Sequence, residues 1–409
     1  MPTRSRGLLL VDTDGDTPAN KAGHAGWMQP VSGKAHAPQR RTYAVALQGA
    51  VSFQWNTSDR KGFKMRIGML TGGGDCPGLN AVIRAAVRKG ILHYNDEFIG
   101  FLEGWKGVLE NRTMPLDLKT TSGILQLGGT ILRSSRTNIK KIEGGFEKCH
   151  QTLQSQKLDA LIALGGDDTQ SISVELVKRG MNVVGVPKTI DNDLSGTDAC
   201  FGFDTAVSIA TEAVDRLHST TESHSRVQVV EVMGRDAGWI AVTAGIAGGA
   251  DVVLAPEKEI DLDDVVRLVK ARWENGKRFA IVVVAEGAKL PHIEGQVTIG
   301  EKTDSFGHAR LSGIGQALAE EIEKRTGYET RSVNLGHTQR GGTPTAYDRM
   351  LATRYGIAAI DLVHAGKFGQ LVVLKGNQIT DIPIADAIAK TRTVGQDIFN
   401  VIEGLQPKK

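Results

Sequence analysis

The sequence predicts an α/β fold with two three-layer αβα domains and mostly parallel sheets. From residue 65 on, short apolar strands recur, and each leads into a glycine-rich loop and then a helical pattern. The strands are almost continuously apolar, as at 279–285, which is typical of parallel strands covered by helices on both faces. About 345 residues follow this pattern, and that length fits two such sheets better than one.

The elements follow one another in a regular order. Strands are expected at 65–70, 159–164, 182–187, 226–232, 279–285 and 331–335, because each is an apolar run that ends in glycine or a charged residue. Helices are expected at 80–91, from the end of the 165–168 loop to residue 178, near 239–248 and near 346–364. Ligands of parallel sheets bind at the carboxyl ends of the strands, so we expect the chemistry in the loops that follow them.

Residues 1–64 form a different kind of sequence. They carry nine Lys and Arg against four Asp and keep no helical or strand period. The apolar run at 8–11 is too short for a signal-peptide core and is followed at once by three aspartates. We therefore expect an N-terminal extension that is poorly ordered.

Composition excludes several classes of protein. The 49 glycines in 409 residues exceed the usual ~7% and indicate turns and ligand loops. The net charge is +3, and the chain after residue 64 is slightly acidic, so we expect no nucleic-acid partner. No apolar run approaches the ~20 residues that span a bilayer, so we expect no membrane partner. Three scattered cysteines fit a reducing, cytoplasmic setting.

The loop Thr71-Gly-Gly-Gly-Asp-Cys-Pro-Gly78 has the composition of an anion-binding loop. Its glycines let the backbone approach an anion, and the next helix offers free N–H groups at its N-terminus. Pro77 spoils a dinucleotide-binding fingerprint, and no Gly-Lys-Ser/Thr follows as in a P-loop. A tight turn without a ligand is the alternative.

Acidic residues follow two of the strands. Asp167 comes after a buried strand, where an unpaired carboxylate is unfavourable and a Mg²⁺ ion on phosphate oxygens would neutralise it. A helix-capping role, open also to Asp168, is the alternative. Asp191 and Asp193 suit a general base beside a metal-orienting residue, although an Asx-turn explains them as well.

Several arginines lie at strand ends or in glycine-rich turns, where a guanidinium matches the geometry of phosphate. They are Arg136, Arg226, Arg235, Arg331 and Arg340, with His337 close to the last. The set indicates more than one phosphate-bearing ligand.

Five motifs together resemble the 6-phosphofructokinase family, over more than four-fifths of the chain. In order they are Thr71-Gly-Gly-Gly-Asp-Cys-Pro-Gly-Leu-Asn80, Gly165-Gly-Asp167, Pro187-Lys-Thr-Ile-Asp-Asn-Asp193, Val232-Met-Gly-Arg235 and Gly336-His-Thr-Gln-Arg-Gly-Gly342. The resemblance implies two Rossmann-like domains in the phosphofructokinase fold. Residues 65–202 with about 339–389 would bind the phosphoryl donor and Mg²⁺, and 203–338 with about 390–409 would bind fructose 6-phosphate.

The resemblance also implies roles for single residues. Asp191 matches the general base, and Gly73, Thr189 and Arg235 match its partners in catalysis. Asp167 and Asp193 match the ligands of Mg²⁺, and Arg136 matches a donor-phosphate ligand. The fructose 6-phosphate pocket is matched by Thr189, Asp191, Arg226, Met233, Gly234, Arg235, Glu286, Arg331, His337 and Arg340. Arg226 and Arg331 would reach a neighbouring subunit, which implies a homodimer or homotetramer.

Two positions bear on the phosphoryl donor. ATP-using members resemble Gly-Gly-Asp-Gly and Gly-Thr-Ile-Asp-Asn-Asp, whereas this chain has Asp168 and Lys188 at the variable places. Both resemble the pyrophosphate-dependent branch, which carries out a reversible step of glycolysis. Lysine also occurs in some ATP-using members, so Asp168 is the sharper discriminator.

An ATP-dependent phosphofructokinase is the nearest alternative, and an NAD- or lipid-type kinase or a nicotinamide dehydrogenase is more remote. The resemblance also places His218 and Asn275 where basic effector ligands are expected, so we expect weak effector control. Residues 289–307 form an insertion without an assigned function.

Overall fold

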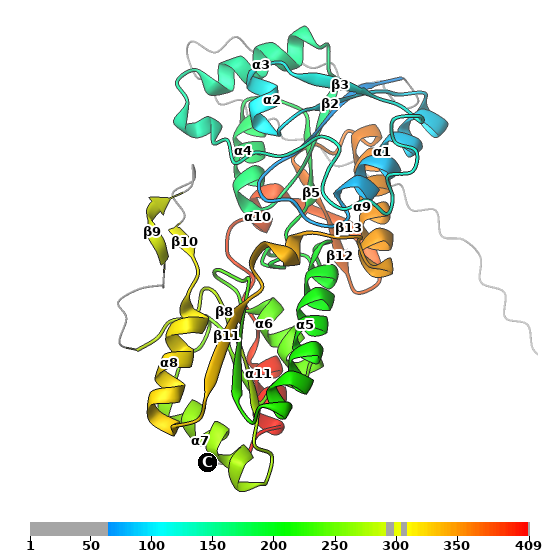
Figure 1. Ribbon diagram of the computed structural model, residues 1–409. Coiled ribbons are helices and arrows are strands. Elements are labelled where there is room, and N and C mark those ends of the chain that lie inside the picture. The colour runs from blue at the N-terminus through cyan, green and yellow to red at the C-terminus, as the bar shows by residue number, and fades with distance from the viewer. Residues whose placement is uncertain (1–63, 292–297, 304–308, 408–409) are drawn as a thin grey trace, which may run out of the picture. The chain divides into compact units, whose positions relative to one another are not determined.

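The computed structural model describes residues 64–291, 298–303 and 309–407 (Figure 1). The expected N-terminal extension, apart from residue 64, lies outside the described residues, as do two stretches of the 289–307 insertion. Residues 298–303 of that insertion form β9 (Thr298–Thr303), which pairs antiparallel with β10 (Ala309–Leu311) just after the insertion.

The larger sheet has seven strands in the order β13-β12-β5-β4-β1-β2-β3. They are β1 (Arg66–Thr71), β2 (Glu97–Phe101), β3 (Thr113–Leu116), β4 (Ala160–Gly165), β5 (Val183–Pro187), β12 (Gln370–Lys375) and β13 (Gln378–Pro383). The five inner strands run parallel, and the two edge strands β3 and β13 pair antiparallel with their neighbours. The predicted mostly parallel sheet is confirmed, and the antiparallel edges complete it.

Successive residues of the inner strands enter opposite apolar layers, because side chains alternate across a pleated sheet. On β4, Ala160, Ile162 and Leu164 join the core cluster that includes α1 (Leu79–Tyr94) and α9 (Ala346–His364). Leu161 and Ala163 join the opposite cluster, with α2 (Trp105–Leu109), α3 (Gly145–Ser155) and α4 (Asp167–Lys178). This two-sided burial explains why the strands are continuously apolar.

The smaller sheet has four parallel strands in the order β11-β6-β8-β7. They are β6 (Val227–Val232), β7 (Val252–Leu254), β8 (Ala280–Ala285) and β11 (Thr330–Asn334). One face is covered by α5 (Phe203–Ser223) and α6 (Trp239–Ala247), and the other by α7 (Leu262–Glu274) and α8 (Ile314–Thr326). The chain closes with α10 (Ile384–Ala387) and α11 (Gln396–Gly404), and α11 packs on α6.

Helices α1 and α9 pack closely because of a glycine. A Cβ at Gly356 of α9 would lie 2.5 Å from the carbonyl oxygen of Val82 in α1. Any side chain there would push the two helices apart. The helix expected at 80–91 continues to Tyr94, where Asn95 adopts a left-handed φ of 59° and donates its N–H to the carbonyls of Gly90 and Ile91.

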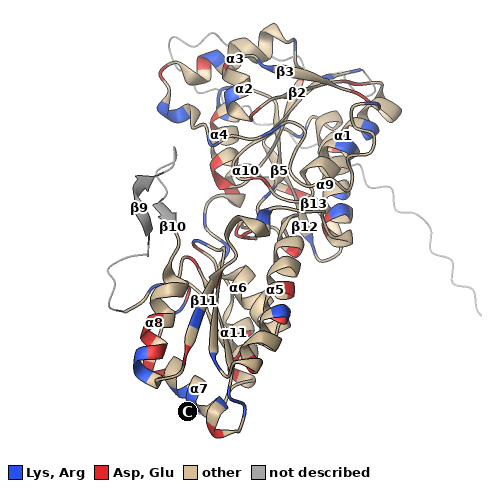
Figure 2. Ribbon diagram, in the orientation of Figure 1, with Lys and Arg blue, Asp and Glu red and all other residues tan. Residues whose placement is uncertain are grey.

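Charged residues of both signs occur side by side on the outer helices, for example on α8 (Figure 2). No helix in the part of the chain that the structure describes is both long and apolar enough to cross a bilayer.

Candidate functional site

Three glycine- and aspartate-containing loops meet at the carboxyl edge of the larger sheet. Strands β1, β4 and β5 are parallel neighbours, with Thr71 opposite Leu164 and Gly165 opposite Pro187. Their register brings the loop after each strand to the same edge. The residues that the sequence singled out at 72–78, 165–168 and 188–193 therefore lie next to one another, as expected of strand-end loops.

Lys188 joins two of these loops. Its side chain is buried, and its Nζ donates a hydrogen bond to the carbonyl oxygen of Gly74. Burial lowers the pKa of Lys188, and the nearby Arg340 guanidinium lowers it further. Gly73 has a left-handed φ of 78°, and a Cβ there would lie 3.5 Å from the Lys188 Nζ. The glycine at this position lets the loop adopt a conformation that few other residues tolerate.

The N–H group of Gly73 is occupied in this structure. It donates to the carbonyl oxygen of Ser135 at 3.1 Å, and the hydroxyl of Ser134 donates back to the carbonyl of Gly73. These contacts tie the loop of Gly73, which the resemblance matches to a catalytic role, to residues 134–135. A ligand has to share that N–H with Ser135 or displace its carbonyl.

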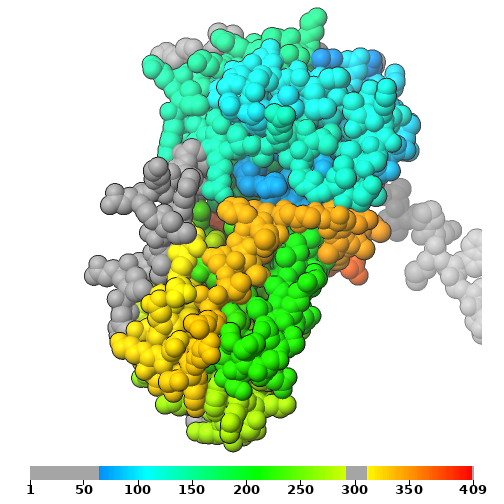
Figure 3. Space-filling model, in the orientation of Figure 1, coloured from blue at the N-terminus to red at the C-terminus, as the bar shows by residue number. Residues whose placement is uncertain are grey.

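A cavity of about 510 Å³ opens beside the glycine loop. It is lined by Gly73, Gly74, Asp75, Thr130, Arg133, Ser134, Ser135, Arg136, His337 and Arg340. Figure 3 shows the surface of the chain's first strand-loop region, in blue, meeting the orange surface of the segment near residue 340. The lining contains three arginines and one histidine but a single acidic residue, Asp75. This excess of positive charge favours the binding of anions.

Sequence reasoning did not single out Arg133. Its φ of 57° is left-handed, and its side chain is 75% exposed, with Glu103 as a distant counter-ion at 4.0 Å. The backbone there is held firmly, since its carbonyl accepts the hydroxyl of Thr71 at 2.7 Å. No motif marks this arginine, and only the fold brings residues 130–136 beside the glycine loop.

Asp191 lies in a turn made by Thr189 rather than by its own side chain. Its N–H donates to Thr189 Oγ1 at 3.0 Å, and that hydroxyl lies 3.4 Å from Asp191 Oδ2. Asp191 Oδ1 is buried and has no hydrogen-bond partner among the described residues, and the same holds for the Nε of Arg340. A buried acceptor and a buried donor that lack partners are costly unless a ligand supplies them.

Asp193 stands among other carboxylates. Burial, together with the negative charges of Asp191 and Asp167, raises its pKa to about 7. In the described parts of the chain, no three His, Cys, Asp or Glu side chains are grouped to hold a metal by themselves. Mg²⁺ is commonly held by one or two carboxylates together with substrate phosphates, so these acids suit it.

Asp167 departs from one expectation. The sequence placed it as a buried acid whose charge needs a partner, but it is exposed in the first turn of α4. Its charge therefore stays hydrated and is also favoured by the helix N-terminus. The burial argument is wrong for Asp167 and applies to Asp193 instead.

The smaller sheet contributes a second group of residues at its own carboxyl edge. Met233, buried, follows β6, and its N–H donates to Gln339 Oε1 at 3.3 Å. Gly234 has a φ of 132°, which only glycine adopts readily. Burial raises the pKa of Glu286 to about 7, helped by the charge of Asp191 and opposed by the guanidinium groups of Arg340 and Arg235. Glu286 therefore interacts electrostatically with Asp191, which follows a strand of the larger sheet.

Arg226 and Arg331 lie elsewhere. Arg226 immediately precedes β6, and Arg331 is the second residue of the parallel strand β11, so both belong to the amino edge of the smaller sheet. A strand of this length separates them from Met233 by roughly 20 Å. Both pair with Glu329, at 3.5 Å and 3.0 Å. Within one chain they do not join the carboxyl-edge residues.

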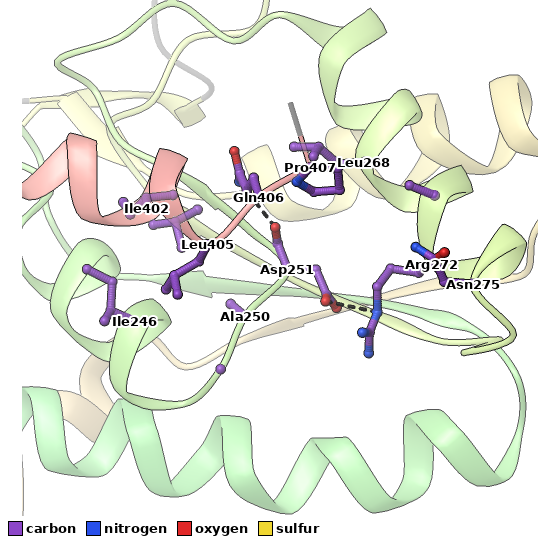
Figure 4. Close-up of a pocket in the computed structure, with 13 residues that line it drawn as sticks. Ile246, Ala250, Asp251, Leu268, Arg272, Asn275, Ile402, Leu405, Gln406 and Pro407 are labelled. Atoms are coloured by element: carbon purple, nitrogen blue, oxygen red, sulfur yellow. Dashed lines mark hydrogen bonds and ion pairs between the residues drawn. The ribbon is translucent and has the colours of Figure 1, made fainter. Parts of the chain in front are cut away.

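A second cavity, of about 350 Å³, lies among α6, α7 and the C-terminal residues (Figure 4). Its lining includes Asn275, one of the positions where a basic effector ligand was expected. Arg272 lies in the lining too, but it pairs with Asp251 at 3.0 Å, and Gln406 donates to the Asp251 carbonyl. The charge of this arginine is largely neutralised by that ion pair. Effector control stays a prediction.

Known proteins resemble this chain over most of its length. A family model described as phosphofructokinase matches residues 66–363. A pyrophosphate--fructose 6-phosphate 1-phosphotransferase of Amycolatopsis mediterranei is 59% identical over 340 residues, which are 83% of this chain and 99% of that protein. An ATP-dependent 6-phosphofructokinase 2 of Streptomyces coelicolor is 51% identical over 342 residues, 83% of this chain and all of that protein.

The fold is similar to that of solved structures. The pyrophosphate-dependent phosphofructokinase of Marinobacter aquaeolei superposes with a TM-score of 0.70 at 20% identity, over 84% of this chain and 92% of that one. This likeness concerns the arrangement of the two sheets and their helices. Together with the matched family model and the identities of 51–59%, it leads to one assignment. The chain belongs to the phosphofructokinase family, a family of enzymes.

Proposed function

We propose that this protein is a pyrophosphate-dependent 6-phosphofructokinase, which transfers a phosphoryl group to the C1 hydroxyl of fructose 6-phosphate. One observation carries the proposal. The buried Asp191 Oδ1 has no donor and the buried Arg340 Nε has no acceptor among the described residues. A sugar hydroxyl and a phosphate oxygen are the groups that these two atoms lack.

Asp191 is the general base in this proposal. It takes the proton of the C1 hydroxyl, and Thr189 holds the carboxylate through its hydroxyl and through the Asp191 N–H. Phosphoryl transfer needs positioning and charge neutralisation more than a protein nucleophile, so a base and phosphate-binding groups suffice. Arg235 and Gly73 complete the proposed catalytic set, in the roles that the resemblance implies for them.

The remaining residues bind the two substrates. Met233, Gly234, Glu286, His337 and Arg340 hold the sugar phosphate, and Arg136 with Gly73 holds the donor. Arg226 and Arg331 lie too far along the sheet to serve their own chain, so we assign them to the site of a neighbouring subunit in a homodimer or homotetramer. The larger sheet, with residues 65–202 and about 339–389, is the donor half; 203–338 with about 390–409 is the sugar half.

Asp167 and Asp193 would hold Mg²⁺, whose charge neutralises that of the donor phosphates. The two fit the ion because both are carboxylates at the same sheet edge, Asp193 half-buried and Asp167 exposed in the first turn of α4. A bound cation would lower the pKa of Asp193 and keep it ionised at neutral pH.

Pyrophosphate is assigned as donor on the strength of Asp168 and Lys188, and the 59% identical relative carries that name. The second candidate is ATP, because relatives named ATP-dependent are 50–52% identical. The experiment is a comparison of initial rates with pyrophosphate and with ATP at saturating fructose 6-phosphate and Mg²⁺. We expect a higher kcat/KM for pyrophosphate and a measurable reverse reaction with phosphate. A preference for ATP refutes the donor assignment, and inactivity with both donors refutes the proposed function.

A further inference from the structure

Asp191 and Asp193 flank a residue whose backbone conformation is energetically unfavourable. Asn192 lies between Asp191 and Asp193, is buried, and has a left-handed φ of 53°. This conformation is disfavoured for residues other than glycine, although asparagine tolerates it best. It persists where surrounding contacts fix it. Its side chain is one such contact, since Asn192 Oδ1 accepts the N–H of Cys200 at 2.9 Å.

The other contacts come from far along the chain. Residues 391–394, here called the C-terminal strap, run beside the loop that carries the acids, and Thr391 forms an antiparallel bridge with Leu194. The N–H of Arg392 donates to the carbonyl of Asp193 at 2.7 Å. Its Nη1 donates to the carbonyl of Asn192 at 3.0 Å. One residue therefore holds two successive peptide groups of the catalytic loop.

On its other side the strap is anchored to the start of α6, one of the helices that cover the smaller sheet. The Arg392 guanidinium lies over the ring of Trp239 at 4.2 Å, and the indole N–H donates to the Arg392 carbonyl at 2.9 Å. Trp239 is the first residue of α6. The N–H of Val394 donates to Glu257 at 2.9 Å, and the same carboxylate accepts the N–H of Gly238.

We propose that Arg392 is a positioning residue, which fixes the Asp191–Asp193 loop relative to the segment 233–239 at the start of α6. The assignment of catalysis to Asp191 rests on the proposed function above. Arg392 contacts backbone carbonyls and an aromatic ring, so its effect on the reaction runs through the loop. The reacting groups come from both sides of this junction, Asp191 from one and Arg235 from the other, and a small misplacement is expensive in such a reaction.

The chemistry of the side chain is specific. A guanidinium donates in its plane while stacking face-on over an indole, which a lysine ammonium cannot reproduce. Arg392→Lys keeps the charge and the backbone N–H contact to Asp193, but loses the planar stack. The inference therefore predicts that the conservative variant is impaired and that charge alone does not restore function.

The test compares Arg392→Ala, Arg392→Lys and Trp239→Phe with a control, Arg354→Ala, whose guanidinium also donates to a backbone carbonyl, that of Asn377. We expect kcat to fall roughly 10- to 100-fold in Arg392→Ala, with smaller changes in the KM of either substrate. Guanidinium chloride at low concentration should recover part of the lost kcat of Arg392→Ala. It should not raise the kcat of the control.

Hydrogen exchange gives a readout that does not require activity. Amides of residues 189–194 should exchange faster in Arg392→Lys and in Trp239→Phe than in the wild type, while those of β1 stay unchanged. Unaltered exchange together with a kcat within twofold of wild type overturns the inference. If the wild type lacks phosphofructokinase activity but the exchange still rises, the proposed function fails and the positioning role of Arg392 stands. If Arg392→Ala does not fold, the lysine and phenylalanine variants decide.

Discussion

Lys188 Nζ donates a hydrogen bond to the carbonyl oxygen of Gly74, and so ties the loop after β5 to the glycine loop after β1. The ammonium group is buried, and its pKa is lowered chiefly by that burial. Lys188 thus has two roles in the proposed site. It shapes the glycine loop, and it brings a positive charge to the donor phosphates.

In the proposed site, Asp168 and Lys188 determine the choice of phosphoryl donor. Asp168→Gly removes a negative charge at the place where the α-phosphate of ATP is expected, so the variant should gain measurable ATP use. Adding Lys188→Gly should abolish pyrophosphate use, because it removes a cation and also frees the Gly74 loop. Initial rates with both donors test this. Unchanged ATP rates in Asp168→Gly would remove Asp168 from donor selection.

Asp191→Asn tests the general base. Turnover should fall by about 10²- to 10⁴-fold, the usual contribution of a positioned acid–base group. Binding of fructose 6-phosphate, measured by calorimetry, should change far less. Asp215→Asn, an exposed acid on α5, is the matched control and should retain full turnover. Near-normal turnover in Asp191→Asn would exclude it as the base.

Arg226 tests the sharing of sites between subunits. Arg226→Ala should raise the KM for fructose 6-phosphate, because charge-assisted hydrogen bonds to its phosphate are lost. Co-expression of Arg226→Ala with Asp191→Asn should restore turnover, since each hybrid dimer then contains one complete site. At a fructose 6-phosphate concentration well below the raised KM, neither variant alone should reach that turnover. A lack of recovery in verified hybrids would contradict sharing, as would a fully active monomer.

The raised pKa of Glu286 predicts that the stability of the protein depends on pH. Burial raises its folded pKa from the ordinary 4.5 to about 7, so the folded state disfavours the charged form. Its contribution to stability is present in full below about pH 4.5 and is lost as the pH rises through about 7. At pH 8, Glu286→Gln should therefore unfold at a higher temperature than wild type. Its free energy of unfolding should be larger by up to about 3 kcal/mol, and the difference should be smaller at pH 5.

Thermal unfolding of both proteins at the two pH values, without substrates or Mg²⁺, provides the measurement. Fructose 6-phosphate is left out because it contacts Glu286 in the proposed site. An equal difference at pH 5 and pH 8 would show that Glu286 titrates in its ordinary range.

The strands and the loops that follow them could be predicted from the sequence because their signals are local. A continuous apolar run such as 160–165 reports burial on both faces, and a glycine cluster such as 72–74 reports a backbone conformation or a close approach. Motifs of this kind lie within a few residues of one another. They were therefore sufficient to place the family, the larger part of the fold and the residues at the carboxyl ends of the strands.

Only the tertiary structure decided which polar groups already have hydrogen-bond partners within the chain. It also decided which predicted site residues lie far from the carboxyl ends of the strands. The Gly73 N–H is taken by Ser135, some 60 residues away, and Arg226 stands at the amino edge of the smaller sheet, paired with Glu329. Arg133 and Arg392 join the site region through loops that no motif marks. A sequence lists donors and acceptors. Their pairing depends on chain reversals and sheet register, which depend on long-range packing rather than on neighbouring residues.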